Sequence, residues 1–522
     1  MLTEVGQSFS QREILLTGAN GFLGKVILGL LLDRVPEFKH LHILVRPRGE
    51  LSATQRFQSE VLDSPPLAAI AGRRGNGFLS QKVSVLGGEL SEPSCGLTAE
   101  AVGRLAGRVS LIINCAGRVD FFPPLDDSFA SNVDGVRSVI ALAKNWDAKL
   151  LHVSTCFVCG EADGLIEEPS PVRGFYPHRR GPEDPSFDHL EELRHAREMI
   201  RQIYESDAGD GNRRSRELAQ RLTALGKQRA ADWGWVNTYT YSKSLGEQMI
   251  DSADGLDYAI VRPAIVESSW QFPFPGWIEG GRTSAPLVLM ALGGQKDWPV
   301  REDAPLDVIP VDMVAAAILV VAAMLLNGRQ QPVYQLGSAD VNPVELGSIV
   351  RWLDGEARKR PQPNAGPASH RGMIDWLAGL RRGARVRFVS EEEAQARRAK
   401  REAGAVRIER RAALLTSILR KTGLPGKRSL EGLSAELRKL SLQSKFREQT
   451  LGQYLPFVLQ NRYIFECENF RAAFSALSDA DQKLLPWRPE AIDWKDYWIN
   501  NQIAGIEKWV QPEAVREWTF KI

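Results

Sequence analysis

Short runs of apolar residues recur along the first part of the chain, and segments with helical periodicity lie between them. The runs predict buried strands at residues 13–16, 41–46, 83–90, 111–117 and 150–160. Residues 25–35 have the pattern of a helix, and another helix is expected to open near Asn132. Strands that alternate with helices are typical of a doubly wound, mostly parallel sheet, so the sequence predicts an α/β fold.

Two later segments predict further helices. Residues 237–250 carry Leu245 and Met249 four positions apart, which is the spacing of one helical face. The most apolar stretch, residues 313–326, is too short to cross a bilayer core of about 30 Å, so it predicts a buried helix.

A glycine-rich turn joins the first predicted strand to the first predicted helix, with Gly18, Gly21 and Gly24 at a GxxGxxG spacing. Glycine lets the backbone approach a pyrophosphate, and the free N–H groups at the start of a helix attract the anion. Strand, glycine turn and helix together predict a dinucleotide site. Its cradle is predicted to consist of Thr17, Gly18, Ala19, Asn20, Gly21, Phe22, Leu23 and Gly24.

The end of the second predicted strand carries Arg46, and Arg48 follows it. A cofactor held through its ribose hydroxyls usually meets an acidic side chain at this place, whereas a guanidinium suits a 2′-phosphate. The two arginines therefore predict NADPH rather than NADH. Further cofactor contacts are predicted at the ends of the third and fourth strands and at a helix start: Glu89, Leu90, Asn114, Ala116, Gly117 and Asn132.

The stretch NTYTYSK presents two tyrosines, of which only one is suited to chemistry. Tyr239 and Lys243 are four apart and share a helical face, whereas Tyr241 and Lys243 are two apart and do not. A phenol with a pKa of about 10 is a poor acid near neutrality unless a nearby ammonium lowers that pKa. We therefore predict Tyr239 as the proton donor to a carbonyl oxygen, with a lowered pKa, and Tyr241 as a packing residue. Thr155, at the end of the fifth strand, is predicted to hydrogen-bond the same oxygen.

Composition and charge exclude several classes. The net charge of +2 gives no argument for nucleic acid, and five cysteines fit a reducing compartment better than a disulfide framework. Cys156 and Cys159 form a CxxC without a second ligand pair, so we predict no metal site and place both in the fifth strand and its exit loop. The first residues have no basic and no apolar secretory region, so a cytoplasmic location is expected.

The motifs TGANGFLGK, VSTCFVCG, NTYTYSK, VRPAIVESSWQFPFPGWIEG and DVIPVDM resemble the extended short-chain dehydrogenase/reductase superfamily, and within it the fatty acyl-CoA reductases. The resemblance implies a Rossmann-type sheet, an NADPH site on the glycine loop, and catalytic roles for Thr155, Tyr239 and Lys243. Tyr239 and Lys243 are also expected to contact the cofactor, with Lys243 on the nicotinamide ribose. It also implies that Arg262 and Pro263 lead into a loop beside the nicotinamide, with Ala264 and Ile265 as contacts.

The end of the chain resembles the same reductases, because residues 465–510 are similar to their C-terminal domain, sometimes named after male sterility. We therefore expect a reductase domain at 1–345 with a helical insert at 161–236, a basic helix-rich region at 346–450, and a helical sterility-like domain at 451–522. The resemblance covers about 10–340 and 450–512.

The resemblance implies that NADPH reduces long-chain acyl-CoA through a fatty aldehyde to a primary alcohol, with release of CoA. Two alternatives stay open: a reductase that stops at the aldehyde, and an extended dehydrogenase or epimerase that acts on another carbonyl or a nucleotide sugar. A third, from a different class, is a membrane- or protein-binding module with a structural cofactor. Intact Thr155, Tyr239 and Lys243 argue against it.

Three segments are candidates for handling the acyl chain. The insert at 161–236 is expected to form a lid or pocket wall, and the aromatic, proline-rich loop at 268–280 to line an apolar tunnel. Residues 371–441 are strongly basic and suggest contact with CoA phosphates or with an anionic membrane surface, including the amphipathic stretch 408–421.

Overall fold

The computed structural model describes residues 4–168, 172–207, 215–281, 283–360, 385–397, 399–400, 403, 407 and 450–510. The chain forms two compact units: unit 1 comprises Met1–Glu279, Asp307–Pro343 and Tyr463–Ile492, and unit 2 comprises Gly280–Leu306, Val344–Arg462 and Asp493–Ile522. Both units are built from separate stretches of sequence, so they do not coincide with the expected boundaries at 345 and 450. The three-domain division stays a prediction.

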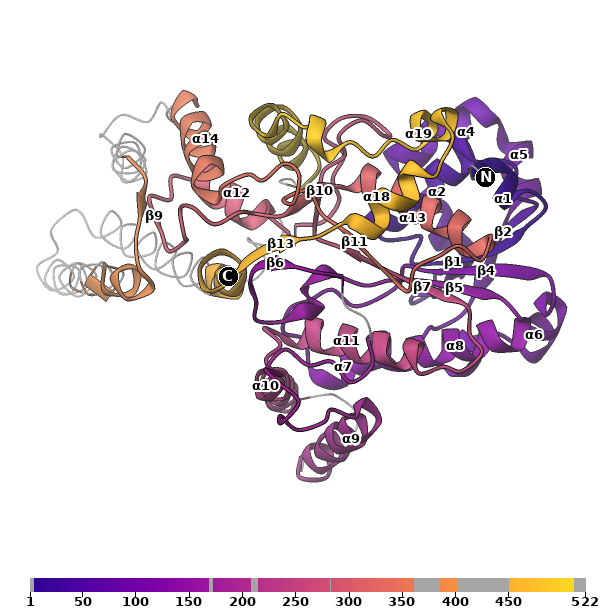
Figure 1. Ribbon diagram of the computed structural model, residues 1–522, viewed down its shortest axis with the longest axis horizontal. Helices are drawn as coiled ribbons and strands as arrows, with labels where there is room; N and C mark the ends of the chain where they lie inside the picture. Colours follow the sequence, from indigo (N-terminus) through magenta and orange to yellow (C-terminus); the bar gives the residue numbers. More distant parts are fainter. Residues whose placement is uncertain are drawn as a thin grey trace, which may run out of the picture. The chain divides into compact units, whose positions relative to one another are not determined.

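Unit 1 is organised around a parallel sheet of seven strands in the order β11-β7-β5-β4-β1-β2-β3 (Figure 1). The strands are β1 (Glu13–Thr17), β2 (His40–Val45), β3 (Val83–Gly87), β4 (Val109–Asn114), β5 (Lys149–Val153), β7 (Tyr258–Pro263) and β11 (Val333–Leu336). Every neighbouring pair is parallel. This arrangement confirms the predicted doubly wound α/β fold.

Helices cover both faces of the sheet (Figure 1). α2 (Phe22–Arg34) and α13 (Val311–Leu326) pack together on one face, and α8 (Gly135–Trp146) and α11 (Thr238–Asp251) pack on the other. Every residue of α13 is buried, which confirms the buried helix expected from its apolar sequence. Among the described residues, no helix combines the length and apolar character needed to cross a membrane.

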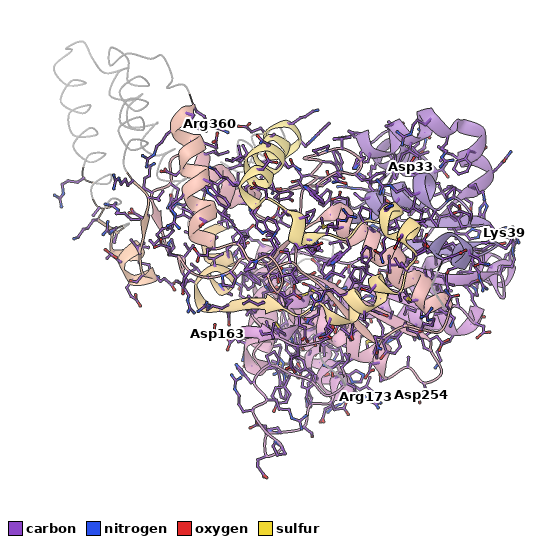
Figure 2. The ribbon with its side chains drawn as sticks, turned by 45° about the horizontal axis from the view of Figure 1, so that its top comes forward. Asp33, Lys39, Asp163, Arg173, Asp254 and Arg360 are labelled. Atoms are coloured by element: carbon purple, nitrogen blue, oxygen red, sulfur yellow. The ribbon has the colours of Figure 1, made fainter. Side chains whose placement is uncertain are left out.

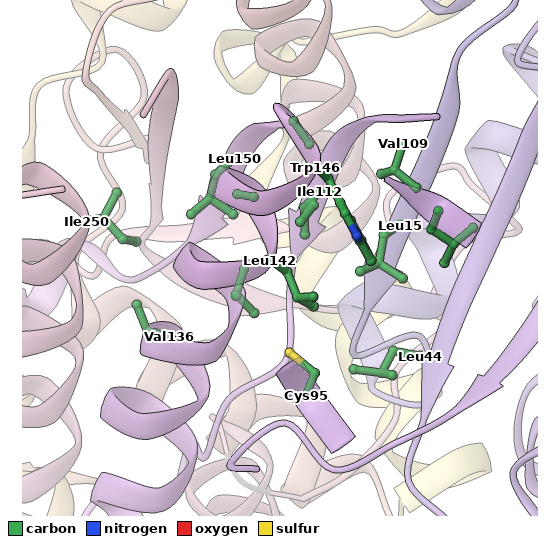
Figure 3. Packing of buried hydrophobic residues seen from close by; sticks show 14 residues of the cluster. Leu15, Leu44, Cys95, Val109, Ile112, Val136, Leu142, Trp146, Leu150 and Ile250 are labelled. Carbon is green, nitrogen blue, oxygen red and sulfur yellow. The ribbon is translucent and has the colours of Figure 1, made fainter. Parts of the chain in front are cut away.

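The core between the sheet and α8 is closed by one large aromatic side chain (Figure 3). Trp146 is 1% exposed and packs with Leu15, Ile112 and Leu150 from three neighbouring strands. Its indole N–H donates to the backbone oxygen of Val102 at 2.9 Å, so its one polar atom is satisfied.

The predicted strand at 150–160 is wrong in its second half. β5 ends at Val153, and Cys156–Cys159 form a short 3-10 helix. The Thr155 side chain caps this turn by accepting the N–H of Phe157 at 3.3 Å. A hydroxyl that binds its own backbone competes with the strand ladder, and this competition ends the strand.

The insert at 161–236 contributes α9 (His189–Glu205) and α10 (Arg216–Trp233), both of which pack on α11. A buried apolar cluster joins these helices and includes Phe187, Leu193, Leu225, Trp235 and Tyr241. The insert is therefore firmly attached to the helix that carries the predicted catalytic residues.

The chain segment at 463–492 belongs to unit 1 and is fixed by carboxylates. The backbone N–H groups of Phe465, Cys467 and Asn469 donate to Asp307, Asp340 and Glu168 at 3.1, 3.0 and 2.8 Å. β13 (Arg462–Phe465) also pairs with β6 (Asp163–Ile166). The sequence predicts a helical C-terminal region at 451–522, whereas the structure has the strand β13 within it.

Unit 2 is smaller, and its described core joins α12 (Ala285–Leu292) to α14 (Leu346–Lys359). The buried Lys296 pairs with Asp354 of α14, and Arg387 pairs with Asp297 at 2.7 Å. Most of the basic region at 371–441, including 408–421, lies outside the described residues, so its expected role stays untested.

The remaining elements of unit 1 are short. They are α1 (Val5–Phe9), α3 (Ala53–Phe57), η1 (Gln58–Leu62), α4 (Pro65–Arg74), α5 (Asn76–Lys82), η2 (Pro93–Gly96), α6 (Ala99–Leu105), α7 (Leu125–Phe129), η3 (Ala130–Asp134), η4 (Cys156–Cys159), β8 (Ile265–Glu267), β10 (Val308–Pro310), α18 (Glu468–Ser475), α19 (Asp479–Leu484) and η6 (Pro489–Ala491). Unit 2 adds β9 (Asp297–Trp298), β12 (Arg387–Phe388), η5 (Pro456–Gln460), α20 (Trp494–Asp496), η7 (Tyr497–Ile503) and η8 (Ile506–Val510).

Candidate active site

The glycine turn after β1 has the steric requirements of a dinucleotide cradle. Gly18 has φ +76°, and a Cβ there would lie 2.6 Å from the backbone N of Ala116. A Cβ on Gly24 would lie 2.1 Å from the oxygen of Gly18. At Gly21 the nearest atom, the backbone oxygen of Gly18, would lie 3.4 Å away, which is an ordinary van der Waals contact. Gly18 and Gly24 thus let chain segments touch, whereas a Cβ at Gly21 would meet no clash within the chain.

The start of α2 suits an anion. Gly21 is its N-cap residue and supplies no side-chain hydrogen bond to the first turn. The first N–H groups of a helix need such partners, and a pyrophosphate would provide them. Lys25 lies just behind the turn, 3% exposed, and its ammonium contacts Glu279 at 2.7 Å. Sequence analysis missed this pair because its members are far apart along the chain.

A group of arginines lies at the end of β2. Arg46 is exposed and its guanidinium lies 3.2 Å from the carboxylate of Glu89, at the end of β3. Arg56 donates to Glu60 at 2.7 Å and also binds the backbone oxygen of Arg46. Asn20 of the glycine turn donates to the same Glu60 at 2.8 Å. These contacts join the arginine group to the cradle, and they reveal Arg56 and Glu60 as neighbours that the sequence did not indicate.

The carboxyl ends of three central strands carry a line of buried polar side chains. Thr17 and Asn114, both predicted cofactor contacts, are 1% and 0% exposed. The Thr17 hydroxyl donates to Asn114 at 2.7 Å, and the Asn114 amide contacts His152 at 3.0 Å. Asn114 is therefore held inside the sheet, and its role in cofactor binding stays a prediction.

Thr155, Tyr239 and Lys243 come together beside this line. Asn237 caps α11 by accepting the N–H of Thr240 at 2.8 Å, which places Tyr239 in the first turn of the helix. The Thr155 hydroxyl hydrogen-bonds the phenol of Tyr239. The ammonium of Lys243 donates to the backbone oxygen of Val153 at 2.7 Å, at the end of β5.

The electrostatics of the two titratable groups differ from expectation. Burial raises the pKa of Tyr239 above its ordinary value, although the hydrogen bond from Thr155 acts in the opposite direction. The expected lowering by Lys243 is therefore wrong. Burial lowers the pKa of Lys243 to about 8, against a raising effect of Glu247. At neutral pH this environment gives a neutral phenol, which can donate a proton, beside a charged lysine.

Tyr241 lies on the other side of α11 and faces the insert. It is fully buried, packs against Trp235, and donates a hydrogen bond to Glu192 of α9. The Glu192 carboxylate also accepts a hydrogen bond from the indole N–H of Trp233 at 3.1 Å and forms an ion pair with Arg229. The environment of Tyr241 is that of a packing residue, as its spacing from Lys243 suggests.

The loop after β4 is tied to α11 through Asn132. Its side-chain oxygen accepts the N–H of Arg118 at 2.9 Å, and its nitrogen donates to Ser242 at 3.0 Å. A Cβ on Gly117 would lie 3.0 Å from that oxygen and 3.9 Å from the nitrogen of Lys243. Asn132 thus shapes the loop at Gly117, whereas direct contact of either residue with a cofactor remains a prediction.

The end of β7 and the residues that follow it lie next to Thr155 and α11. Arg262 is buried in an ion pair with Glu247 of α11, and its Nε lies 3.0 Å from the carboxylate. Thr155 contacts the backbone oxygen of Pro263 at 3.5 Å. Ala264 and Ile265 follow, with backbone N–H groups bound to Leu336 and Asp307. The four predicted cofactor positions 262–265 therefore border the site, and Arg262 fixes α11 to β7.

One buried hydroxyl supports the presence of a ligand. Ser154 is 6% exposed, and its Oγ finds no hydrogen-bond partner within the described part of the chain. A buried hydroxyl without a partner is costly, and a bound cofactor or substrate oxygen would satisfy it. Together with the start of α2 at Gly21, which has no side-chain cap, and the exposed Arg46, this makes the residues present a good fit for a phosphorylated dinucleotide.

The aromatic loop at 268–280 is packed rather than hollow. Asp312 of α13 accepts the N–H groups of Trp270, Gln271 and Phe272 at 2.8, 2.8 and 2.9 Å. Phe272 is 7% exposed and would contact a Cβ on Gly29 of α2. The small cavity beside the loop holds only about 10 Å³. Within unit 1 the loop thus packs on α2 and α13, and its expected role as a tunnel lining stays a prediction.

Sulfur and metal chemistry find no site in the described residues. Burial raises the pKa of Cys115 and of Cys159 to about 12, and it raises that of Cys156 as well. No group of three His, Cys, Asp or Glu side chains in the described ranges could hold a metal ion.

The fold and the site together define a class of protein, the nucleotide-binding reductases of the extended short-chain dehydrogenase type. The defining features are the doubly wound sheet, the glycine turn, and a tyrosine and a lysine four positions apart beside the carboxyl ends of the strands. Residues 16–318 match the family model of the NAD-binding domain described as male sterility protein. The chain belongs to this family, whose relatives include fatty acyl-CoA reductases.

Two curated relatives and one solved structure illustrate the likeness. "Fatty acyl-CoA reductase 2, chloroplastic" of Arabidopsis thaliana is 31% identical over 68% of this chain and 59% of its own length. "Alcohol-forming fatty acyl-CoA reductase" of Simmondsia chinensis is 30% identical over 68% of this chain and 72% of its own. The reductase domain of a non-ribosomal peptide synthetase from Mycobacterium tuberculosis superposes with a TM-score of 0.53 at 19% identity, over 97% of this chain and 95% of that chain. The last comparison shows the fold alone.

Proposed function

We propose that the protein is an NADPH-dependent reductase of long-chain fatty acyl-CoA that forms the primary alcohol through the aldehyde. The observation that carries this proposal is the meeting of Thr155, Tyr239 and Lys243 beside the glycine turn, in a chain that belongs to the fatty acyl-CoA reductase family. Long-chain acyl-CoA and fatty aldehyde are the proposed substrates. The relatives' names support fatty acyl-CoA as the substrate class and, for one of them, an alcohol as the product. The long chain and the aldehyde intermediate are part of the proposal.

The choice of NADPH rests on the arginine group. The nicotinamide cofactor supplies hydride to the carbonyl carbon. Arg46 is exposed at the end of β2 and is free to turn from Glu89 towards a 2′-phosphate, with Arg48 as a second cation nearby. Gly21 and the start of α2, which has no side-chain cap, would hold the pyrophosphate.

Tyr239 and Thr155 act on the substrate oxygen. As hydride reaches the thioester carbonyl, negative charge develops on its oxygen, and two hydroxyl donors stabilise it. Because burial raises the pKa of Tyr239, the phenol stays protonated throughout the neutral range but is a weaker acid than a free tyrosine. Its proton would therefore move only to the strongly basic oxygen that forms as hydride is added. Lys243 would hold the cofactor ribose and keep a positive charge next to the phenol.

The overall reaction balances with two equivalents of reductant. In the first reduction, acyl-CoA, NADPH and a proton give aldehyde, NADP⁺ and free CoA, because the C–S bond breaks and the thiolate takes the proton. In the second reduction, aldehyde, NADPH and a proton give alcohol and NADP⁺, with Tyr239 again as the proton donor. Hydride is the nucleophile in both steps, so no cysteine is required, and desolvation raises the pKa of the Cys115 thiol to about 12.

The test is the stoichiometry of palmitoyl-CoA turnover under anaerobic conditions. We expect two NADPH consumed for each CoA released, with hexadecanol as the product. One NADPH per CoA with accumulating aldehyde would replace the proposal with a two-electron thioester reductase. Binding of NADPH without turnover of any acyl-CoA would refute the proposed substrate class, and would favour a reductase of another carbonyl or a binding module.

A further inference from the structure

A line of four buried polar side chains crosses the centre of the sheet and ends at Lys243. Thr17 of β1, Asn114 of β4 and His152 of β5 are direct neighbours in the strand registers. The Thr17 hydroxyl donates to Asn114 Oδ1 at 2.7 Å, and Asn114 Nδ2 lies 3.0 Å from His152 Nδ1. His152 Nε2 then lies 3.1 Å from the Nζ of Lys243. None of the four side chains is more than 5% exposed.

His152 has no role in the reduction as described so far. It is 0% exposed, and it lies in a strand whose neighbours Leu150, Leu151 and Val153 are apolar. A buried imidazole is unfavourable unless both ring nitrogens find partners, and an aliphatic side chain would fill the same space without that requirement. Both nitrogens of His152 are engaged, one on each side, which indicates a polar function at this position.

The direction of the hydrogen bonds depends on the charge of Lys243. In one arrangement, Asn114 Nδ2 donates to Nδ1 of His152, so the proton of the neutral imidazole is on Nε2. This proton points at Nζ of Lys243, which can accept it only as an uncharged amine. An ammonium needs an accepting Nε2, so the proton moves to Nδ1 and the Asn114 amide presents its oxygen instead. The two arrangements of the line correspond to the two charge states of Lys243.

We propose that His152 is a positioning residue that orients Lys243 and, through Asn114 and Thr17, connects its charge state to the cofactor-binding turn. Thr17 directly precedes Gly18, and its Oγ1 accepts the N–H of Ala116 at 3.2 Å. This is the loop against which Gly18 packs. The inference rests on the NADPH-binding part of the proposed function, because it concerns the lysine that would hold the cofactor ribose.

The groups around Lys243 leave it as the one that titrates in the weakly alkaline range. Burial and the neighbouring Lys243 lower the pKa of His152 well below its ordinary value. Burial raises the pKa of Cys115 to about 12 and also raises that of Tyr239. Glu247, on the same helix, is paired with Arg262. A change in cofactor affinity near pH 8 would therefore report the charge of Lys243.

The experiment measures the dissociation constant of NADPH by fluorescence titration over a pH series that brackets about 8. We expect wild-type affinity to weaken as Lys243 loses its proton. In His152→Leu an apolar side chain replaces the acceptor of the ammonium, so the midpoint should fall by about one pH unit. His152→Gln keeps an amide that can donate and accept, and it should restore the wild-type midpoint.

His42→Leu is the matched control. His42 is also a histidine in a parallel strand, 5% exposed, but it contacts Ser84 and Glu13 far from the glycine turn. We expect this variant to lose stability and to keep the wild-type midpoint.

Three outcomes would overturn the proposal: no midpoint in the wild type, an unmoved midpoint in His152→Leu, or an equal shift in His42→Leu. If His152→Leu does not fold, Asn114→Leu takes its place under the same criterion. Because the readout is binding of NADPH, a failure of acyl-CoA turnover alone would refute the proposed function and leave this inference standing.

Discussion

The two tyrosines of α11 offer a paired test of the site. Tyr239→Phe removes the hydroxyl that hydrogen-bonds Thr155, and Tyr241→Phe removes the hydroxyl that donates to Glu192. Both changes delete one oxygen from the same helix, two residues apart, and both leave the ring in place. The difference between the variants therefore isolates the position of the hydroxyl.

We expect Tyr239→Phe to lower kcat and Tyr241→Phe to lower the free energy of unfolding. Loss of a positioned general acid lowers kcat by about 10²–10⁴-fold, which corresponds to about 3–5 kcal/mol in the barrier. Tyr239→Phe should show this loss with an unchanged dissociation constant for NADPH. In Tyr241→Phe, Glu192 keeps Arg229 and Trp233, so we expect a loss of about 1–2 kcal/mol in the free energy of unfolding. Its kcat should stay close to that of the wild type.

The assay combines single-turnover reduction of palmitoyl-CoA, NADPH titration and denaturant unfolding for the three proteins. The reasoning would be refuted by a Tyr239→Phe protein with kcat within about threefold of the wild type, since no general acid contributes so little. A Tyr241→Phe protein that loses activity but not stability would equally show that the two roles have been assigned to the wrong residues.

Three further changes test other parts of the site and its scaffold. Gly21→Ala should fold normally and weaken NADPH binding. Gly24→Ala should instead destabilise the protein, because the new Cβ would lie 2.1 Å from the backbone oxygen of Gly18. Equal unfolding midpoints for the two variants would contradict this expectation. Arg46→Ala should weaken NADPH binding by about tenfold and leave NADH binding unchanged, and a parallel loss for both cofactors would argue against contact with a 2′-phosphate. Burial alone raises the pKa of Glu13, but hydrogen bonds from neighbouring basic side chains lower it to about 2. The free energy of unfolding should therefore fall as pH drops from about 4.5 towards about 2, and Glu13→Gln should lose this dependence; an unchanged acid slope would show that other carboxylates cause it.

The ion pairs at the periphery of unit 1 could not be predicted from the sequence. Lys39 lies at the rim of unit 1 (Figure 2), is 55% exposed, and pairs at 3.0 Å with Glu13, which is 2% exposed. In the sequence, Glu13 only opens an apolar run and gives no sign of an ion pair. Its partners are His42 of β2 and the residues just before β2 and β4, Lys39 and Arg108, so only the fold brings them together.

The local features of the site could be predicted from the amino-acid sequence alone. The order of strands and helices, the GxxGxxG turn and the separation of Tyr239 from Tyr241 all depend on residues close together in the chain. The period of a helix and the steric freedom of glycine act over that range, so such patterns can be read without knowledge of the fold.

The environment of those residues, by contrast, depends on how the whole chain folds. The contact of His152 with Asn114 and Lys243 joins positions 38 and 91 apart, and the Lys25–Glu279 pair joins positions 254 apart. The raised pKa of Tyr239, opposite to the expected direction, arises from burial under segments distant in sequence. Burial and hydrogen bonding depend on how the strands are ordered in the sheet, and this order is absent from any short stretch of the chain.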